Sequence, residues 1–337
     1  MAQRMRVLAV SLAWVCVAGA QAAPATAGRR VIVVGIDGLS VNGVVTAHTP
    51  RLHQLMAEGA WTLAARAVMP TLSSPNWESI ITGSAPEQHG ITSNGYFRNM
   101  VEFEPVCRDS EGKFPTIFEL LRTANPGARI AVFHDWPGFA ELLEKHVPDV
   151  LRHERGAAKT TAAAIEYWKQ YRPDLMFVHL DNVDHAGHSE GWSSAAYFRA
   201  VAEADGHLGE ILDMLSAGHE TDSTYVLVTS DHGGKGRGHG KNSLAEIQIP
   251  WILGGPDIAR GEVSVPVNTF DTAATIAWIF RLATPSCWIA RPVLAAFQPG
   301  MVAARAAAPA INCGAQRSLI TAAGWLPNPP ELGKEGN

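Results

Sequence analysis

Three short apolar runs, each followed closely by a carboxylate, constrain the fold of this chain most strongly. They cover residues 31–36, 175–180 and 225–229, and β-branched and aromatic side chains are frequent in them. Apolar runs of this length are typical of strands that are buried on both faces of a parallel sheet. In such sheets, polar residues at the carboxyl ends of the strands face the ligand crevice. We therefore expect a ligand site where these strands end.

Helical patterns separate these runs, at residues 49–59, 115–123, 157–170 and 195–215. Strands that alternate with helices predict an α/β fold, a three-layer sandwich with a central, mostly parallel β-sheet. The 337 residues suit a single α/β unit. We expect one catalytic domain at residues 29–300 and a peripheral Ala/Pro-rich C-terminal tail at residues 301–337.

The N-terminus has the pattern of an export signal. Arg4 and Arg6 precede an apolar run at residues 7–20, and Ala20 and Ala22 flank Gln21 in a cleavage pattern of small residues. The alternative is a membrane anchor, but the run is shorter than the ~20 residues that a spanning helix needs. The pattern predicts a signal peptide at residues 1–22, a periplasmic or secreted protein, and no stable membrane insertion after cleavage.

The net charge and the cysteines limit which partners and which disulfides we expect. The net charge is −5 and no basic block is present, which argues against a nucleic-acid scaffold as partner but not against a small nucleotide. Cys16 leaves with the signal, and the remaining cysteines enter a compartment that permits disulfides. Cys287 and Cys313 are close in sequence, which favours a bridge between them that would leave Cys107 unpaired and buried, but the sequence alone leaves the pairing of the three open.

Three aspartates and three histidines lie at or just beyond the strand ends. Each has a simple structural explanation when taken alone, such as a turn at an Asp-Gly pair or an exposed i,i+4 ion pair. Together, carboxylate and imidazole ligands suit a borderline ion such as zinc, and six of them suffice for two ions. Two ions about 4 Å apart can bind the attacking and leaving oxygens of a phosphoryl transfer. The six residues are Asp37, Asp184, His188, Asp231, His232 and His239.

A nucleophile is expected in the segment that follows the first strand. Residues 69–83 read MPTLSSPNWESIITG and residues 86–91 read PEQHGI. This order resembles the type I phosphodiesterase and nucleotide pyrophosphatase family of the alkaline phosphatase superfamily. In that family the Thr or Ser nucleophile stands two residues before a Pro-Asn pair. The resemblance therefore implies an alkaline-phosphatase-like fold, Ser73 rather than Ser74 as nucleophile, and Asn94 as a donor to a phosphate oxygen.

The same resemblance assigns the metal ligands. The motifs at residues 37–38, 184–188 and 230–233 match the family's Asp-Gly, Asp-x-x-Gly-His and Ser-Asp-His-Gly, and the pair at 239–240 matches its final His-Gly. Many relatives insert a long segment before that last histidine, whereas six residues stand there in this chain. Segments 248–256 and 270–276 look like the family's closing strand and final helix. The implied cofactor is two Zn2+ per chain, or another divalent metal, with Asp184, His188 and His239 on the first ion and Asp37, Ser73, Asp231 and His232 on the second.

The function implied is an exported two-metal phosphoric ester hydrolase that cleaves a small phosphate ester, possibly a nucleotide, through a phosphoserine intermediate. One alternative is a phosphomonoesterase, for which Arg152, His153 and Arg155 are candidate extra cations. Another is a non-catalytic, metal-stabilised binding protein. A sulfatase is disfavoured because Trp77 stands where that class carries an arginine.

Some neighbouring side chains have open or minor roles. Asp181, His179 and His185 are rival ligands, and of these we expect Asp181 and His185 behind the ligands or at the surface. Lys235, Arg237 and Lys241 surround His239 and either contact substrate oxygens or are solvated loop charges.

Overall fold

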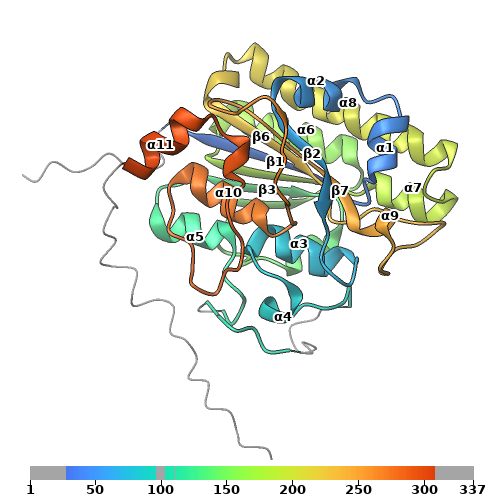
Figure 1. The fold of residues 1–337 in the computed structure, drawn as a ribbon, viewed down its shortest axis with the longest axis horizontal. Coiled ribbons are helices and arrows are strands. Elements are labelled where there is room, and N and C mark those ends of the chain that lie inside the picture. Colours follow the sequence, from blue (N-terminus) through green and yellow to red (C-terminus); the bar gives the residue numbers. More distant parts are fainter. Residues whose placement is uncertain (1–27, 96–102, 110, 308–337) are drawn as a thin grey trace, which may run out of the picture.

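The computed structural model describes residues 28–95, 103–109 and 111–307. The predicted signal peptide, Cys313 and most of the predicted tail lie outside the described residues. One eight-stranded sheet forms the middle layer, and helices cover both of its faces (Figure 1). The predicted three-layer α/β architecture is confirmed.

The sheet is parallel over most of its width. The exception is β7, which runs antiparallel to both of its neighbours, β6 and β2. The strands, in their order across the sheet, are β4 (Val150–His153), β3 (Ile130–His134), β5 (Leu175–Leu180), β1 (Arg30–Ile36), β6 (Thr224–Thr229), β7 (Gln248–Gly254), β2 (Ala60–Arg66) and β8 (Gly261–Glu262).

The helices form two layers, and the four predicted helices are present within a few residues of their expected bounds. One face of the sheet carries α3 (Ser73–Thr82), α5 (Ile117–Ala124) and α10 (Asp271–Phe280). The other face carries α1 (Val41–Thr46), α2 (Pro50–Glu58), α6 (Ala157–Tyr171), α7 (Asn182–Glu190) and α8 (Ala195–Ala217). The remaining elements are α4 (Pro86–His89), α9 (Leu244–Ile247), α11 (Pro299–Ala307) and the short turns η1 (Pro137–Glu141), η2 (Thr221–Ser223) and η3 (Leu294–Ala296).

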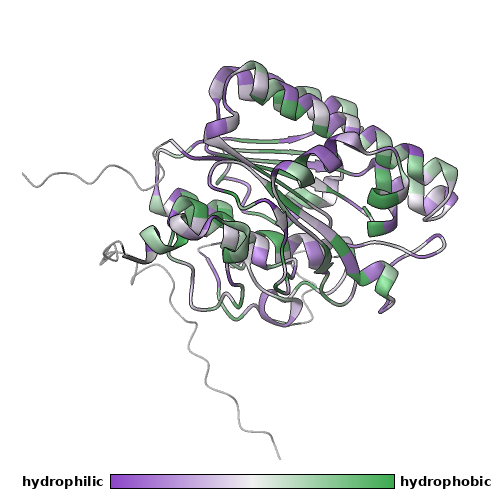
Figure 2. Ribbon diagram, turned by 45° about the horizontal axis from the view of Figure 1, so that its top comes forward, coloured by the Kyte–Doolittle hydropathy of each residue, from purple (hydrophilic) through white to green (hydrophobic). Residues whose placement is uncertain are grey.

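Strand β1 shows why the central strands are apolar without interruption. Val31 and Val33 belong to the core shared with α3, α5 and α10, whereas Ile32, Val34 and Ile36 belong to the core on the opposite face. Both faces of β1 are buried, so the alternation of apolar and polar residues that marks a half-exposed strand is absent. Figure 2 shows the hydrophobic green of the strands between helices that mix green and purple.

The disulfide joins Cys107 to Cys287, so the expected bridge between Cys287 and Cys313 is wrong, as is the unpaired Cys107. The two Cα atoms are 6.3 Å apart although 180 residues separate the cysteines. Both side chains lie in or against the core on the α3, α5 and α10 face, because packing of that layer brings the segment after α4 to the loop after α10. Proximity in sequence is thus a poor guide to pairing when the sheet returns distant segments to one place.

We expect removal of this bridge to destabilise the fold. Replacing Cys287 by alanine should lower the free energy of unfolding by about 2–5 kcal/mol, because the bridge closes a long loop of the unfolded chain. Denaturant unfolding of the oxidised proteins measures this difference. The matched control is Cys313→Ala, which should leave stability unchanged; an equal loss in that variant would mean that the pairing differs from the one described.

The start of the predicted tail is helical and packed. Met301 and Val302 of α11 contact the core, and the Arg305 guanidinium lies 4.2 Å from the centre of the Trp278 ring. The first part of the tail therefore packs against the apolar surface of the core. Among the helices of the described residues, none is long and apolar enough to span a bilayer.

Candidate active site

The register of the central strands brings the predicted ligands to one edge of the sheet. Gly35 of β1 is paired with His179 of β5 and with Thr229 of β6, so the three strands end at the same level. Asp37 follows β1, and Asp231 stands two residues beyond the end of β6. The segment after β5 turns at once into α7, which carries Asp184 and His188 one turn apart.

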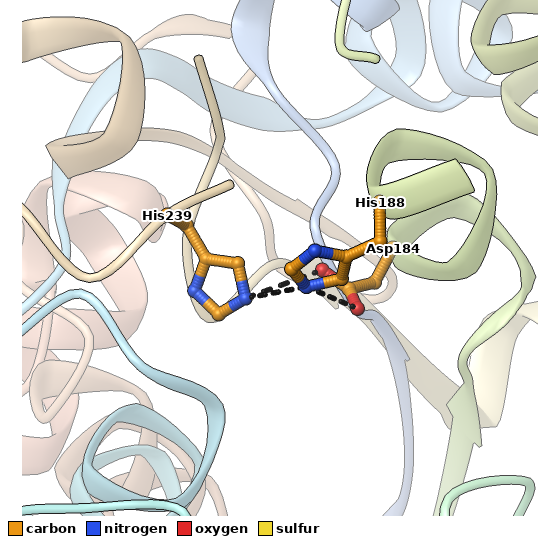
Figure 3. Close-up of side chains that lie close together, drawn as sticks. All are labelled: Asp184, His188 and His239. Atoms are coloured by element: carbon orange, nitrogen blue, oxygen red, sulfur yellow. Dashed lines mark hydrogen bonds and ion pairs between the residues drawn. The ribbon is translucent and has the colours of Figure 1, made fainter. Parts of the chain in front are cut away.

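A first group of ligand atoms comes from Asp184, His188 and His239, which all lie within 4.8 Å of one another. The two Nε2 atoms are 3.0 Å apart, and they lie 3.5 and 3.6 Å from the Asp184 carboxylate oxygens (Figure 3). Helix α7 supplies two of these side chains, and the loop between β6 and α9 supplies the third. The six-residue spacing before His239 is therefore long enough to reach the other two ligands.

A second group comes from Asp37, Asp184 and His232, within the same 4.8 Å limit. His232 Nε2 lies 3.6 Å from Asp37 Oδ1 and 3.1 Å from Asp231 Oδ2. The hydroxyl of Ser73 lies 3.3 Å from the same nitrogen. Asp184 therefore belongs to both groups, whereas the family resemblance places it on the first ion alone.

The three histidines share a hydrogen-bonding pattern that turns their Nε2 atoms toward these groups. In each ring Nδ1 faces a backbone carbonyl, so Nδ1 carries the proton and Nε2 keeps a free lone pair. The Nε2 atoms of His188 and His239 lie 3.0 Å apart, close enough to bind the same cation. The distances are 3.1 Å from His188 to the Arg237 carbonyl, 2.8 Å from His232 to that of Gly233, and 2.7 Å from His239 to that of Thr71.

Each of three aspartates beside these histidines has one oxygen that lacks a hydrogen-bond donor among the described residues. Asp37 Oδ1, Asp184 Oδ1 and Asp231 Oδ2 are buried, and none has a hydrogen-bond partner among the described residues. Burial and the neighbouring carboxylates raise the pKa of Asp184 to about 9 and raise the pKa values of Asp37 and Asp231 well above their usual range. Buried charges of one sign need a counter-charge. Neutral imidazoles and orphaned carboxylate oxygens fit two divalent ions such as Zn2+.

Two side chains hold the other oxygen of Asp37, and the sequence analysis expected this role for neither of them. Trp77 Nε1 donates to Asp37 Oδ2 at 2.9 Å, and His179 Nε2 lies 3.3 Å from the same atom. Burial lowers the pKa of His179 to about 4, so its ring is neutral. With Oδ2 engaged, Oδ1 is directed to His232. Trp77 stands in the motif one turn after Ser73, which was the available signal.

The loop before the nucleophile is braced from two sides. Asn76 accepts from the backbone N–H of Val68 at 2.7 Å and donates to the carbonyl of Leu72 at 2.9 Å. Thr71 Oγ1 donates to the Lys241 carbonyl at 2.6 Å, which ties this loop to the one that carries His239. Ser73 is thereby fixed as the first residue of α3, where the helix dipole favours negative charge.

Asn94 lies next to the nucleophile, although it comes from the segment after α4. Its side-chain oxygen accepts from the backbone N–H of Ser74 at 2.8 Å. This bond engages the amide oxygen, so the Nδ2 group is the part of the side chain that can donate to another acceptor.

The remaining candidates lie outside the two groups. Asp181 directly precedes α7, and burial raises its pKa to about 7. His185 is exposed, as are Lys235, Arg237 and Lys241. Arg152 lies on edge strand β4 and pairs with Glu154, with 2.6 Å between its Nε and Oε1. His153 Nε2 contacts the Asp135 carbonyl at 2.9 Å.

A known protein family matches more than half of the chain. The family described as type I phosphodiesterase / nucleotide pyrophosphatase matches residues 31–237. An ectonucleotide pyrophosphatase/phosphodiesterase 2 of Saccharomyces cerevisiae is 26% identical over 60% of this chain and 47% of its own length. The human family member 1 is 28% identical over 55% of this chain and 21% of its own length. The chain thus spans about half the length of the yeast relative and less than a quarter of the human one.

Solved structures show the same fold at low sequence identity. Murine ectonucleotide pyrophosphatase / phosphodiesterase 5, solved also as an inactive form with AMP, superposes with a TM-score of 0.66, at 18% identity over 76% of this chain and 96% of its own. A mutant of the alkaline phosphatase PafA gives 0.68, at 12% identity over 82% of this chain and 100% of its own. A 2-O GAG sulfatase gives 0.61, at 14% identity over 78% and 73%. The fold is alkaline-phosphatase-like.

Proposed function

The chain belongs to the type I phosphodiesterase / nucleotide pyrophosphatase family, and from that premise we propose that it is a metal-dependent phosphodiesterase that uses Ser73 as nucleophile. One observation supports this most directly. Two groups of metal-type ligands share Asp184, and the hydroxyl of Ser73 lies 3.3 Å from His232 of the second group. A nucleophile beside paired cation sites is the arrangement that an in-line phosphoryl transfer needs.

The proposed mechanism has two displacements at phosphorus. Two divalent ions held by these groups would supply positive charge that lowers the pKa of a serine hydroxyl and stabilises a leaving oxygen. Ser73 Oγ forms a bond to phosphorus while the bond to the leaving oxygen breaks. Because the displacement is in line, the leaving oxygen departs on the side opposite Ser73. Water then breaks the Oγ–P bond and restores the serine.

The surrounding residues have supporting parts in this scheme. The Nδ2 group of Asn94 donates to a non-bridging phosphate oxygen, since its Oδ1 is engaged by Ser74. The N-terminus of α3 favours the negative charge of the phosphoryl group at Ser73. Each step thus relies on groups that the fold has positioned before substrate arrives.

A phosphomonoesterase is the main alternative, because it would use the same serine and ions. Such an enzyme needs extra cations for the second negative charge of a terminal phosphate. Arg152, the first candidate, is already paired with Glu154, and β3 separates its strand from β5. A sulfatase is disfavoured on this reading too, since Trp77 is buried and bound to Asp37. The diester is therefore the substrate that we propose.

The relatives support a proposal for the substrate and the location. The relatives include ectonucleotide pyrophosphatase/phosphodiesterases, and one solved relative holds AMP. We propose a small nucleotide ester as substrate and a periplasmic or secreted enzyme, with two Zn2+ per chain. The export signal that this requires is the pattern at residues 1–22.

Metal content and ester preference test the proposal together. Protein purified from medium without added metal should carry two zinc ions per chain by elemental analysis. It should hydrolyse bis-nitrophenyl phosphate at least about tenfold more efficiently, by kcat/KM, than nitrophenyl phosphate. Chelation should abolish both activities, and zinc should restore them. A strong preference for the monoester would favour the phosphomonoesterase, and metal-free protein with full activity would exclude the mechanism.

A further inference from the structure

Trp192 lies where three ligand-bearing segments meet, yet it is not itself a ligand. It comes two residues after the end of α7, and only 7% of its surface is exposed. Its backbone N–H donates to the Gly236 carbonyl at 2.7 Å, which anchors it to the loop before His239. Its indole Nε1 donates to the Gly38 carbonyl at 2.9 Å, next to Asp37.

Two glycines are explained by the space that this indole occupies. A Cβ atom at Gly187 would come within 2.6 Å of the indole, and one at Gly234 within 2.1 Å. Side-chain carbons do not approach each other so closely, so only glycine permits the contact at either position. Gly187 stands directly before His188, and Gly234 follows His232 by two residues. The ring is therefore held between the two segments whose histidines face the ligand groups.

The indole also contacts both histidine rings of the first group. The ring centres of Trp192 and His188 are 5.3 Å apart with an 82° angle between the planes, and those of Trp192 and His239 are 5.9 Å apart at 65°. These are edge-to-face contacts, which restrain ring orientation. Such restraint matters for His188, because 47% of its side chain is exposed to solvent.

We propose that Trp192 is a positioning residue for the first metal group, the one formed by Asp184, His188 and His239. It fixes both histidine rings by packing, and through Gly38 it fixes the distance of that group from Asp37. Ligands whose rotamers are locked bind an ion with less loss of conformational entropy, so loss of this support weakens binding. The inference rests on the proposed function only in requiring that the ligand groups bind divalent ions.

The test compares Trp192→Phe with a matched control, Trp168→Phe. Trp168 is also buried and also loses an indole hydrogen bond, to Glu220, but it lies on α6 away from the ligand groups. Zinc affinities of the metal-free proteins are measured by competition with a chromogenic chelator. We expect Trp192→Phe to weaken the binding of one of the two zinc ions by roughly tenfold or more, and to leave the affinity for the other ion nearly unchanged. Trp168→Phe should bind both ions as the unmodified protein does.

The outcomes separate this inference from the proposed function. Two unchanged zinc affinities in folded Trp192→Phe would overturn the positioning role and leave the proposed function standing. An unmodified protein that binds no zinc would overturn both. If Trp192→Phe does not fold, Trp192→Tyr keeps more of the ring volume, and unchanged affinities in that variant would equally overturn the role. Equal weakening in Trp168→Phe would also contradict it, since the effect would then be general destabilisation.

Discussion

Replacing Ser73 by alanine should reduce diester turnover by about 10³-fold or more, because the covalent path is then closed. The variant should remain folded, since alanine removes one hydroxyl from a helix start whose loop is braced by Thr71 and Asn76. Steady-state kcat with bis-nitrophenyl phosphate is the measurement. Acid-quenched turnover of the unmodified enzyme should also yield a peptide that carries the transferred phosphoryl group on Ser73.

The neighbouring serine provides the control for this prediction. Ser74 is also buried, and its backbone N–H is bound by Asn94. Because alanine retains that N–H, Ser74→Ala should keep turnover within a few-fold of the unmodified enzyme. If Ser74→Ala lost activity and Ser73→Ala kept it, Ser74 would be the nucleophile. Near-normal turnover in both variants would favour direct attack by water, or a binding protein with a contaminating enzyme.

Replacing Asp184 by asparagine should lower metal content more than loss of any other single ligand, because among the described residues Asp184 alone belongs to both groups. We expect less than one ion per chain and a loss of about 10³-fold or more in kcat/KM, since the ions account for several kcal/mol of charge stabilisation in such reactions. Elemental analysis and kinetics measure the two effects. The metal-free variant should be at least as stable as the metal-free parent, because one of three close buried carboxylates is gone.

Asp181→Asn is the matched control for Asp184. Asp181 is an aspartate of the same segment, and it takes part in neither of the ligand groups found in the described residues. The variant should retain two ions and most of the activity. Loss of both ions here, with retention in Asp184→Asn, would contradict the assignment of the shared ligand. A loss of only one ion in Asp184→Asn would mean that its carboxylate serves a single ion, as the family resemblance implies.

The sequence predicted the local elements well because their causes are local. The apolar runs at residues 31–36, 175–180 and 225–229 became β1, β5 and β6, and the helical pattern at 157–170 became α6. Burial on both faces leaves a signature in the run itself. The reversed direction of β7 left no such signature, since a buried strand reads alike in either direction.

The sequence also predicted which residues come together in the candidate site. All six ligand candidates come together at one edge of the sheet, beside Ser73, because parallel strands deliver their carboxyl ends to the same place. Their roles as ligands stay predictions. The pairing of Cys107 with Cys287 was missed, since it depends on the path of the chain over 180 residues rather than on spacing.

The sequence by itself thus determined which side chains are available and which strand each of them follows. The tertiary structure alone decided which of these side chains contact one another. Asp184 lies in both groups, and Trp77 and His179 contact one oxygen of Asp37. Trp192 packs against two histidines. Motif spacing records only the separation along the chain. The contacts of Trp77 and His179 with Asp37, and of Trp192 with His239, join residues 40 or more positions apart. Their distances are set by the packing of helices on the sheet.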